Sequence, residues 1–587
     1  MPAPTPPLAS VLVANRGEIA WRIFRACREL DIRTIGVYSE VDRGAPWLTG
    51  VDDAFLLGPA PPAESYLHLE RVLAVAERSG ATAVHPGYGF LSESADAARA
   101  VTDAGLVWVG PRPDAITAMG DKLSARANAR AAGVPVVPGT HEPTEDADVV
   151  RDFAAEHGYP VAVKAAFGGG GRGLRVVDAP EQLDEALEAA RREAVASFGR
   201  GEVYVERYLR RPRHVEAQVL ADEHGTCLFL GERDCSTQRR HQKLIEEAPA
   251  PGLDEALRRD LGAAAVAVSR EVGYTGAGTV EFLVEDGRFY FLEMNTRLQV
   301  EHPVTELVTG IDLVHWQLRV AAGQALPWTA DDLVPRGHAI EVRINAERPA
   351  AGFAPAAGRI TRWEQPAGPG VRVDAGVVAG WDVPSMYDSL LAKLIAYGAD
   401  RDHARRTLAR AVDEFVVEGV PTTLPFHRLA LAHPDMVAGT VSTISVEQEW
   451  DLSVLPPDTD AVPADGPEAP SRTYTVEIDG RALQVAVFAD DDADRNGTPR
   501  RRRRRASSVG GSDDARVTAP MQGTVVKLAA AVGDAVEAGE LVLVLEAMKM
   551  ENHVLAHRDG VIGTVFVEPG AVVQQGDPLF TVDTVDT

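Results

Sequence analysis

The chain has 587 residues, a length that predicts about three to five domains. Its apolar content of 45% and charged content of 25% are typical of a globular protein. The formal net charge of −27 argues against general nucleic-acid binding, which requires a basic surface. The three cysteines are too few for a disulfide framework, so the composition favours a reducing, cytoplasmic setting. No apolar run approaches the length of a membrane span, and we predict neither a signal peptide nor a membrane partner.

Residues 10–110 alternate short apolar runs with helical stretches. The pattern predicts strands at 10–15, 33–39 and 81–86 and helices at 17–30 and 65–80. Strands that alternate with helices in this way form a parallel sheet covered on both faces. The predicted fold class is therefore α/β, with a doubly wound parallel sheet at the N-terminus.

A second α/β region covers residues 118–330, and residues 335–447 return to mixed strands and helices. Residues 451–470 are then rich in Pro, Asp and Ala, and residues 474–488 predict a β-hairpin with Asp-Gly at its turn. A run of arginines, Arg500–Arg505, follows between acidic and Gly/Ser-rich segments, which is typical of a linker. We do not assign this run to nucleic acid or membrane, because acidic residues flank it.

The C-terminal segment predicts short strands with glycine turns and contains a loose internal repeat. Gly-Thr-Val at 523–525 recurs at 563–565, and Gly-Glu-Leu-Val at 539–542 corresponds to Gly-Asp-Pro-Leu at 576–579. Two similar β halves predict a small, pseudo-symmetric flattened barrel or sandwich. Lys549 lies at the join, within Glu-Ala-Met-Lys-Met, where an exposed turn would suit a long covalent tether. An ordinary solvated lysine is the alternative.

Residues 161–175 predict a strand that opens into a glycine-rich loop. Lys164 lies on the strand, and Gly168–Gly171 follow it. Phosphate oxygens need many close N–H donors, which backbone without side chains supplies, while Lys164 adds a point charge that Arg172 can assist. The loop is not a Walker A sequence, because no Gly-Lys-Ser/Thr follows the glycines. A flexible surface loop is the alternative.

Residues 279–295 predict a β-hairpin with two carboxylates and an amide on one face. A three-residue loop at 285–287, ending in Gly at the left-handed position, would bring Glu281, Glu293 and Asn295 onto that face. A two-residue loop would instead put the two glutamates on opposite faces. The three-residue loop pairs Val284 with Arg288 and Glu281 with Phe291, and leaves the opposite face to Val280, Phe282, Val284, Tyr290, Leu292 and Met294. The oxygen set suits Mg²⁺ or Mn²⁺, and an edge hairpin with solvated acids is the alternative.

The segment after the hairpin, residues 295–306, gathers side chains that can bind a small anion. Arg297 and Gln299 can grip a planar anion through two hydrogen bonds, and Glu301 can act as a general base. A polar loop that closes the sheet is the alternative.

A second polar segment, residues 233–247, adds further candidates. Lys243 and His241 can contact phosphate or another anion. Cys235 is interpreted as packed and inert rather than reactive.

These residues lie in motifs that resemble biotin carboxylase, an ATP-grasp enzyme, from Leu12 to about Phe426. The matching stretches are ANRGEIA, HPGYGFLSE, MGDK, VKAAFGGGGRGLR, ERDCSTQRRHQKLIEEAPA, GTVEFL, FLEMNTRLQVEHPVTE and EVRINAE. The C-terminal segment resembles a biotin carboxyl carrier domain, with APMQG and the biotinylation motif EAMKM. A carboxylase and a carrier in one chain, without a transferase, is similar to the α subunit of actinobacterial acetyl- or propionyl-CoA carboxylases. Lipoyl domains share the carrier architecture but rarely have Met on both sides of the lysine.

The resemblance implies a role for each matching residue. The ATP-binding residues would be Lys122, Lys164, Gly168, Gly169, Gly170, Gly171, Glu206, Leu209, His214, Glu216 and Leu283. Mg²⁺ or Mn²⁺ would bind Glu281, Glu293 and Asn295, and bicarbonate would bind Lys243, Arg297, Gln299 and Val300. The catalytic residues would be Glu301 as general base, Lys243, Arg297, and Arg343, which would stabilise the biotin enolate. Tyr88 would lie at the rim of the biotin approach, and biotin would be attached to Lys549. Phe167 stands where relatives often have glycine, but it removes no ligand.

The resemblance also implies a division into domains. These are an N-terminal α/β domain at 1–117, an ATP-grasp domain at 118–330 with a mobile lid at about 135–205, a C-terminal α+β domain at 331–450, a linker with a small hairpin at 451–515, and an all-β biotinyl domain at 516–587.

The implied function is half of a carboxylation reaction. Glu301 would deprotonate bicarbonate, which would attack the γ-phosphate of ATP to give carboxyphosphate, and the CO₂ released would carboxylate biotin on Lys549. The implied partners are a carboxyltransferase β subunit, a biotin protein ligase and other copies of the chain within a larger complex. The residues leave open which acyl-CoA is carboxylated and whether a further small subunit is needed.

Three other functions compete with this one. An ATP-grasp ligase that joins a carboxylate to an amine would not need the carrier. A protein that only stores biotin would not need the metal and base positions. A pyruvate carboxylase would need a transferase region for which the chain has no room.

Overall fold

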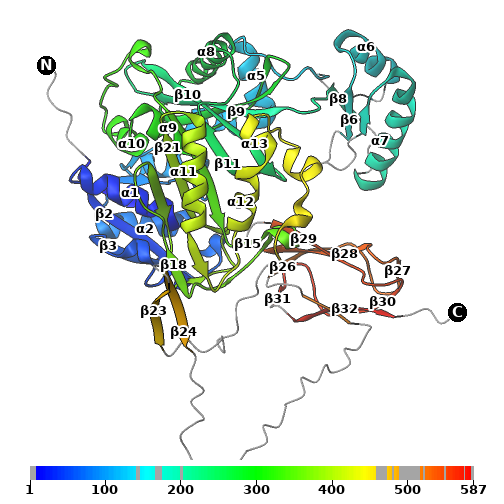
Figure 1. Ribbon diagram of the computed structural model, residues 1–587. Helices are drawn as coiled ribbons and strands as arrows, with labels where there is room; N and C mark the ends of the chain where they lie inside the picture. The colour runs from blue at the N-terminus through cyan, green and yellow to red at the C-terminus, as the bar shows by residue number, and fades with distance from the viewer. Residues whose placement is uncertain are drawn as a thin grey trace, which may run out of the picture.

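The computed structural model describes residues 8–140, 144, 146–165, 175–198, 203–457, 472–478, 481–487, 516–519, 523–547, 550–573 and 576–583. These residues form an N-terminal parallel sheet, a large central sheet, a smaller three-stranded sheet and a C-terminal pair of sheets (Figure 1). No described helix is long and apolar enough to cross a membrane. Several residues discussed above lie outside the described part of the chain, namely Phe167, Gly168–Gly171, Arg172, Arg500–Arg505 and Lys549.

The N-terminal region forms a five-stranded parallel sheet with strand order β3-β2-β1-β4-β5. Its elements are β1 (Ser10–Val13), α1 (Gly17–Glu29), β2 (Arg33–Ser39), β3 (Asp53–Gly58), α2 (Leu69–Ser79), β4 (Ala83–His85), α3 (Ala95–Asp103), β5 (Val107–Trp108) and α4 (Pro113–Gly120). Successive residues of β1 point to opposite faces, so Val11 joins the core under α1 and Leu12 joins the core under α2 and α3. The doubly wound parallel sheet predicted from the sequence is confirmed.

Strands β3 and β5, at the two edges of this sheet, have no counterpart among the predicted elements, and β3 is the longer of the two. The residues of β3 alternate between half-buried and exposed positions for most of its length. An edge strand buries less surface than an inner strand, so its apolar pattern is weaker in the sequence.

An eight-stranded antiparallel sheet forms the centre of the molecule, with strand order β13-β12-β9-β10-β11-β14-β21-β19. Its strands are β9 (Arg213–Ala221), β10 (Cys227–Arg239), β11 (Gln242–Ala248), β12 (Gly276–Glu285), β13 (Arg288–Asn295), β14 (His338–Asn345), β19 (Val371–Ala375) and β21 (Leu390–Gly398). Pairing of β11 with β14 joins the part before residue 330 to the part after it. The sheet is therefore continuous across the predicted domain boundary.

Helices cover both faces of this sheet and extend to its ends. They are α5 (Lys122–Ala131), α8 (Glu255–Glu271), α9 (His302–Thr309), α10 (Leu313–Ala321), α11 (Arg401–Glu414), α12 (Leu424–Ala432) and α13 (Pro434–Ala438). Val342 of β14 belongs to the core with α11 and α12, whereas Ala339 belongs to the core with α9. Glu341 and Arg343 alternate with Val342 and therefore lie on the α9 side.

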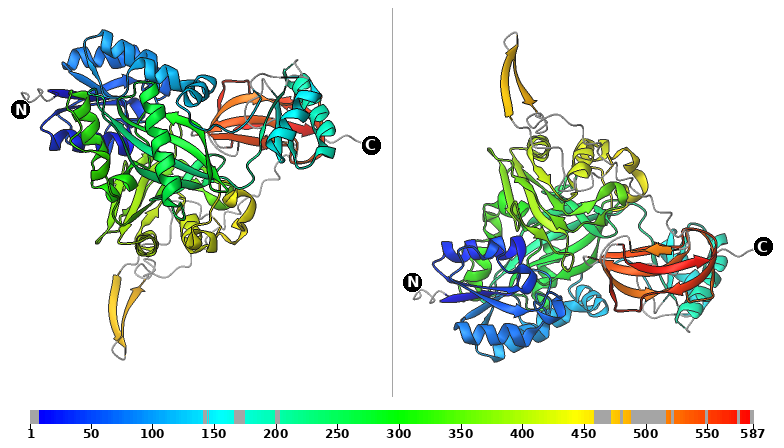
Figure 2. Two further views of the ribbon diagram at one scale, coloured as in Figure 1. Left: turned by 90° about the horizontal axis from the view of Figure 1, so that it is seen from above. Right: turned by 90° about the horizontal axis from the view of Figure 1, so that it is seen from below.

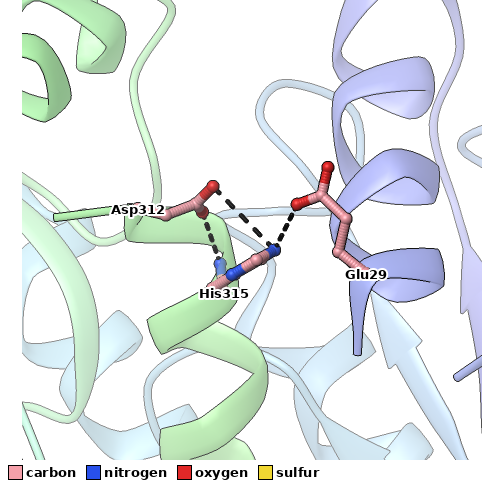
Figure 3. Close-up of side chains that lie close together, drawn as sticks. All are labelled: Glu29, Asp312 and His315. Carbon is pink, nitrogen blue, oxygen red and sulfur yellow. Dashed lines mark hydrogen bonds and ion pairs between the residues drawn. The ribbon is translucent and has the colours of Figure 1, made fainter. Parts of the chain in front are cut away.

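Helices α1 and α10 link the N-terminal region to the central one. Arg22 on α1 forms ion pairs with Glu306 at 2.9 Å and with Asp312 at 2.7 Å. Beside these pairs, His315 Nε2 lies 2.9 Å from Glu29 Oε2 and 3.9 Å from Asp312 Oδ2 (Figure 3). Asp312 also caps α10 by accepting the backbone N–H of His315. These contacts hold the first sheet against the second.

A small three-stranded sheet with two helices projects from the rest of the molecule (Figures 1 and 2). Its elements are α6 (Ala147–His157), β6 (Val161–Ala165), β7 (Arg175–Val177), α7 (Leu183–Phe198) and β8 (Val203–Arg207), with strand order β7-β6-β8. The strand predicted before the glycine-rich loop is β6. The mobility of this small sheet and its helices as a lid stays a prediction.

Short strand pairs lie between and after the last strands of the central sheet, and a hairpin follows them. The pairs are formed by β15 (Glu347–Arg348), β16 (Ala354–Pro355), β17 (Gly358–Arg359), β18 (Arg362–Glu364), β20 (Asp382–Val383) and β22 (Val416–Glu418). The predicted linker hairpin is present as β23 (Arg472–Ile478) and β24 (Arg481–Val487), which pair in an antiparallel manner.

The C-terminal segment forms two four-stranded sheets, with orders β25-β32-β30-β27 and β29-β28-β26-β31. Their strands are β25 (Arg516–Thr518), β26 (Gly523–Leu528), β27 (Ala535–Val536), β28 (Leu541–Ala547), β29 (Met550–Leu555), β30 (Gly560–Val565), β31 (Val572–Val573) and β32 (Pro578–Asp583). The sequence repeat matches these sheets, because β26 pairs with β28 in one and β30 with β32 in the other. The predicted all-β sandwich is confirmed.

Candidate active site

A cavity of about 1030 Å³ lies over the central sheet and brings together most of the predicted site residues. Those on its wall are Tyr88, Lys122, Glu206, Leu209, His214, Lys243, Glu281, Leu283, Glu293, Asn295, Arg297, Gln299, Val300, Glu301 and Arg343. Glu216 is fully buried beneath the wall rather than on it. The side chain of Lys164 lies outside the described part of the chain, so its place relative to the cavity stays a prediction.

The hairpin of β12 and β13 has a two-residue turn, not the predicted three-residue loop. Glu285 pairs with Arg288, which leaves Asp286 and Gly287 to connect the strands. Both connecting residues have positive φ, 51° and 70°, as the Asp-Gly signal for a tight hairpin turn favours. The predicted register is therefore wrong, both for Val284 with Arg288 and for Glu281 with Phe291.

A β-bulge restores the shared face that a two-residue turn would otherwise have removed. Phe282 pairs with Phe291, but the adjacent Glu281 pairs with Glu293, which leaves Leu292 as an extra residue. Directly paired residues share a face of the sheet. Glu281 and Glu293 therefore lie side by side, and Asn295, two residues further along β13, lies on the same face.

The bulge also changes which side chains fill the opposite face. The buried core there contains Val280, Phe282, Val284, Phe289, Phe291 and Met294. Leu292, expected in that core, is 39% exposed, and Tyr290 pairs with Leu283 on the cavity side. The two-residue turn puts Phe289 and Phe291 on the core face in place of Tyr290, and Leu292 is the bulged residue itself, which explains both corrections.

The oxygen ligands on the hairpin fit a divalent cation. Burial and the neighbouring Glu281 carboxylate raise the pKa of Glu293. Burial would also raise the pKa of Glu281, but Lys243 and His214 outweigh it and lower that pKa. Two adjacent carboxylates and the amide oxygen of Asn295 are hard ligands of the kind that Mg²⁺ and Mn²⁺ prefer. A cation there would relieve the repulsion that raises the Glu293 pKa.

Lys243 on β11 connects Glu281, a predicted metal ligand, with Glu301, the predicted base. Its Nζ donates to Glu216 Oε2 at 2.6 Å, to Glu281 Oε1 at 3.0 Å and to Glu301 Oε1 at 2.6 Å. Burial would lower the pKa of Lys243, but these three carboxylates raise it well above its usual value. The ammonium group is therefore fixed as a cation in the wall of the cavity.

Glu301 lies between two cations. Lys243 contacts one carboxylate oxygen, and Arg343 Nη2 donates to the other, Oε2, at 3.0 Å. Burial would raise the pKa of Glu301, but Lys243, Arg343 and Arg233 hold it well below its usual value. Arg343 Nε also donates to Glu246 Oε1 at 2.6 Å. Glu301 is thus a buried, ionised carboxylate at the cavity.

Arg233 is a site residue that the sequence analysis did not single out. It is fully buried on β10 and donates to Gln299 Oε1 at 2.7 Å and to Glu216 Oε1 at 2.6 Å. Gln299 in turn donates from Nε2 to Glu281 Oε1 at 2.7 Å. The available signal in the sequence was a charged residue in the same strand as the apolar run Cys-Leu-Phe-Leu at 227–230. A buried charge in a strand requires partners, so this residue could have been expected to contact other charged side chains.

Arg297, predicted to bind bicarbonate, lies on the wall of the cavity. Its Nη2 donates to Asn295 Oδ1 at 2.7 Å, and its Nε lies 3.0 Å from Glu93 Oε2. Asn295 donates from Nδ2 to Glu281 Oε1 at 2.8 Å. The guanidinium is therefore oriented by a hydrogen bond to Asn295 and an ion pair with Glu93, and it lines the cavity beside Gln299.

The residues assigned to the nucleotide line the part of the cavity near β8 and β9. Glu206 is on β8, Leu209 follows it, and His214 is on β9. His214 Nε2 lies 2.8 Å from Glu281 Oε2, so its imidazole is directed to the hairpin of β12 and β13. Lys122 is the first residue of α5 and also lies on the wall.

The three cysteines are free and buried. Burial raises the pKa of the Cys235 thiol well above its usual value, with Glu216 adding to the effect. A thiol that stays protonated is a poor nucleophile, which agrees with the interpretation of Cys235 as inert.

Four family models match the chain in order. They are "Biotin carboxylase, N-terminal domain" at 7–116, "Carbamoyl-phosphate synthase L chain, ATP binding domain" at 121–329, "Biotin carboxylase C-terminal domain" at 341–448 and "Biotin-requiring enzyme" at 515–582. The chain is 50% identical to the biotin-dependent acyl-coenzyme A carboxylase alpha3 subunit of Mycobacterium leprae, covering 97% of this chain and 98% of the relative. It is 52% identical to biotin carboxylase of Pseudomonas aeruginosa, covering 72% and 94%. A solved biotin carboxylase from Campylobacter jejuni superposes with a TM-score of 0.68 at 43% identity, covering 75% of this chain and 98% of that one.

The fold, the cavity and these matches define an ATP-grasp biotin carboxylase joined to a biotinyl domain. The chain belongs to the family of biotin-dependent acyl-CoA carboxylase α subunits. Its activity is the ATP-dependent carboxylation of biotin by bicarbonate.

Proposed function

We propose that Glu301 is the general base for bicarbonate and that Lys549 of the same chain carries the biotin that is carboxylated. The observation that supports the first part is the pair of contacts on Glu301, with Lys243 on one oxygen and Arg343 on the other. This geometry keeps Glu301 ionised and fixed at the cavity wall, ready to accept a proton.

Lys243 controls the basicity of Glu301. While Lys243 donates to Glu301, it holds the pKa of that carboxyl low, which makes the group a weak base. Lys243 also lines the cavity, so an anion there competes for its ammonium. Drawing Lys243 away from Glu301 raises the proton affinity of Glu301 at the moment when bicarbonate is present.

Glu281, Glu293 and Asn295 would hold Mg²⁺ or Mn²⁺. When bound, the cation neutralises charge on the phosphoryl group that ATP transfers. Arg297, Gln299 and the Val300 backbone would orient bicarbonate. ATP would be bound by Lys122, Lys164, Gly168–Gly171, Glu206, Leu209, His214 and Leu283. Glu216 lies beneath the wall of the cavity and would act through its contact with Lys243. Arg343 would stabilise the biotin oxyanion.

The carrier completes this half-reaction. Ala547 of β28 pairs with Met550 of β29, and Lys549 falls between them in the sequence. Biotin on Lys549 would be attached by a biotin protein ligase and delivered to a carboxyltransferase β subunit, so the isolated chain is expected to carboxylate its biotin but not an acyl-CoA. Assembly as a homo-oligomer within a larger complex and a cytoplasmic location are part of the same proposal.

The variant E301Q tests the base assignment. It should bind ATP nearly as the wild type does and lose bicarbonate-dependent ATP turnover by about 10²-fold or more, the usual scale for a general base. E247Q is the matched control, because Glu247, like Glu301, is a buried carboxylate held by two basic side chains. Glu247 is on β11 and contacts His338 and Arg401. E247Q should keep wild-type turnover per folded molecule. Unchanged turnover in E301Q would mean that another group takes the proton.

A further inference from the structure

Lys393 is a fully buried lysine in the central sheet, on β21. Its Nζ donates to the backbone oxygen of Val300 at 2.8 Å and lies 3.2 Å from Glu18 Oε1. Asp374 Oδ2 is 4.0 Å away. Removing an ammonium group from water is costly unless partners satisfy it, so these contacts must be formed together.

Glu18 is the counter-ion, and it comes from a different part of the chain. It lies in the first turn of α1 and also accepts a hydrogen bond from the Tyr88 hydroxyl, at the rim of the cavity. The backbone at Gly376 packs so closely on α1 that an added Cβ would lie 2.6 Å from the Glu18 nitrogen. Glu18 is therefore held in place from both the N-terminal and the C-terminal regions.

The Val300 oxygen has a direct geometric relation to the base. The C=O of Val300 and the N–H of Glu301 belong to one planar peptide unit. A donor that fixes the carbonyl fixes the rotation of that unit, and with it the direction in which the Glu301 side chain leaves the backbone. Both residues line the cavity, whereas Lys393 lies behind them in the sheet.

We propose that Lys393 is a positioning residue for bicarbonate activation. It holds the Val300–Glu301 peptide so that Val300 and Glu301 present a preformed site, and Glu18 supplies the charge that keeps Lys393 in place. The inference rests on the proposed roles of Glu301 as the general base and of Val300 in binding bicarbonate. It adds a residue that is distant from the reacting atoms and acts through the backbone.

The double variant K393M/E18Q separates positioning from stability. K393M alone leaves Glu18 buried without its cation and should lower the thermal midpoint. Adding E18Q removes that charge and should restore most of the midpoint, but the Val300 oxygen still lacks its donor. We expect the double variant to raise the KM for bicarbonate about tenfold and to lower bicarbonate-dependent kcat to a similar extent, while the KM for ATP stays within about twofold.

E18Q alone removes the counter-ion but leaves the Lys393 donor to the Val300 oxygen, so its bicarbonate KM should lie between those of the wild type and the double variant. If K393M/E18Q does not fold, K393Q/E18Q, whose paired amides can bond to each other, allows the same measurement. A wild-type KM for bicarbonate in a folded double variant would overturn the inference.

Parallel assay of E301Q distinguishes this outcome from failure of the proposed function. An inactive E301Q beside a double variant with wild-type kinetics refutes only the positioning role. A fully active E301Q refutes the base assignment, and the role of Lys393 is then decided by the bicarbonate KM alone.

Discussion

The central sheet buries charged side chains at its site, whereas the described buried side chains of the C-terminal sandwich are all apolar. In the sheet, Glu216 binds both Arg233 and Lys243, and Lys243 is held further by Glu281 and Glu301. In the sandwich, residues such as Val525, Leu545 and Phe580 form the core. Buried ion networks are costly and do little for stability, so their presence in one region marks where the chemistry takes place.

This contrast predicts different responses to substitution in the two regions. In the sandwich, function would depend on one tethering side chain and the fold on apolar packing, so the two can be separated. In the sheet, each charged residue supports others, so a change at one position affects both the site and the fold. The predictions below test this difference, starting with the largest effect.

K549R should abolish biotin attachment, because arginine cannot form the amide with activated biotin. The fold of the carrier should be unaffected, since no part of the described apolar core is altered. A streptavidin blot measures the attachment, and thermal unfolding of the same sample measures the fold. A blot that remains positive would place the biotin on another lysine.

E293Q should reduce metal-dependent ATP turnover by about 10²-fold, the scale seen when one contact to the transferring charge is lost. The stability of the variant should be equal to or higher than that of the wild type. Burial and Glu281 both raise the pKa of Glu293, so a charged Glu293 is unfavourable there, and the neutral amide removes this unfavourable charge. Steady-state kinetics against Mg²⁺ and thermal unfolding measure the two effects. E285Q, at the turn end of β12, is the control and should leave turnover unchanged. A turnover loss matched by a loss of folded protein would contradict the metal assignment.

The hairpin shows how far sequence patterns reach. Two β-rich runs around residues 285–287 predicted the two strands, and Glu281 and Glu293 do share a face. The predicted turn length was wrong, because the turn has two residues. The two glutamates share a face only because the bulge at Leu292 shifts the pairing by one residue. The bulge lies beside Phe291, which pairs with β12 on one side and bonds to Pro135 on the other, and no local signal in the sequence marks its position.

Contacts between distant segments were harder still to predict. Lys393 contacts Val300 across 93 positions, and Arg22 contacts Glu306 across 284. In their own segments Lys393, Arg22 and Glu306 look like ordinary charged residues, and Val300 like an ordinary apolar one. By contrast, the repeat in the sandwich and the helices and strands around β1 depend on short-range periodicity, which the sequence displays directly.

The smallest effect concerns two adjacent carboxyls on β11 with opposite pKa shifts. Glu246 faces α9, where burial raises its pKa to about 7, although Arg343 opposes the shift. Glu247 is also buried, which would raise its pKa, but hydrogen bonds from His338 and Arg401 lower it. Since neighbouring strand residues point to opposite faces, one substitution in each tests the two environments separately.

The sign of each pH effect follows from proton binding. Between its ordinary pKa of 4.5 and about 7, Glu246 keeps a proton in the folded state that the unfolded chain releases, so its contribution to stability is lost as pH rises through 7. E246Q stays neutral and should flatten this slope, with a gain over wild type at pH 7.5 relative to pH 5 on the order of 1–3 kcal/mol. Glu247 stabilises the fold above its ordinary pKa, and that stabilisation is lost as pH falls through its lowered pKa, so E247Q should be destabilised at both pH values. Urea unfolding at pH 5 and 7.5 measures both variants. The same pH slope in E246Q as in the wild type would show that Glu246 does not hold the proton, and that another carboxyl of the network, such as Glu341, does.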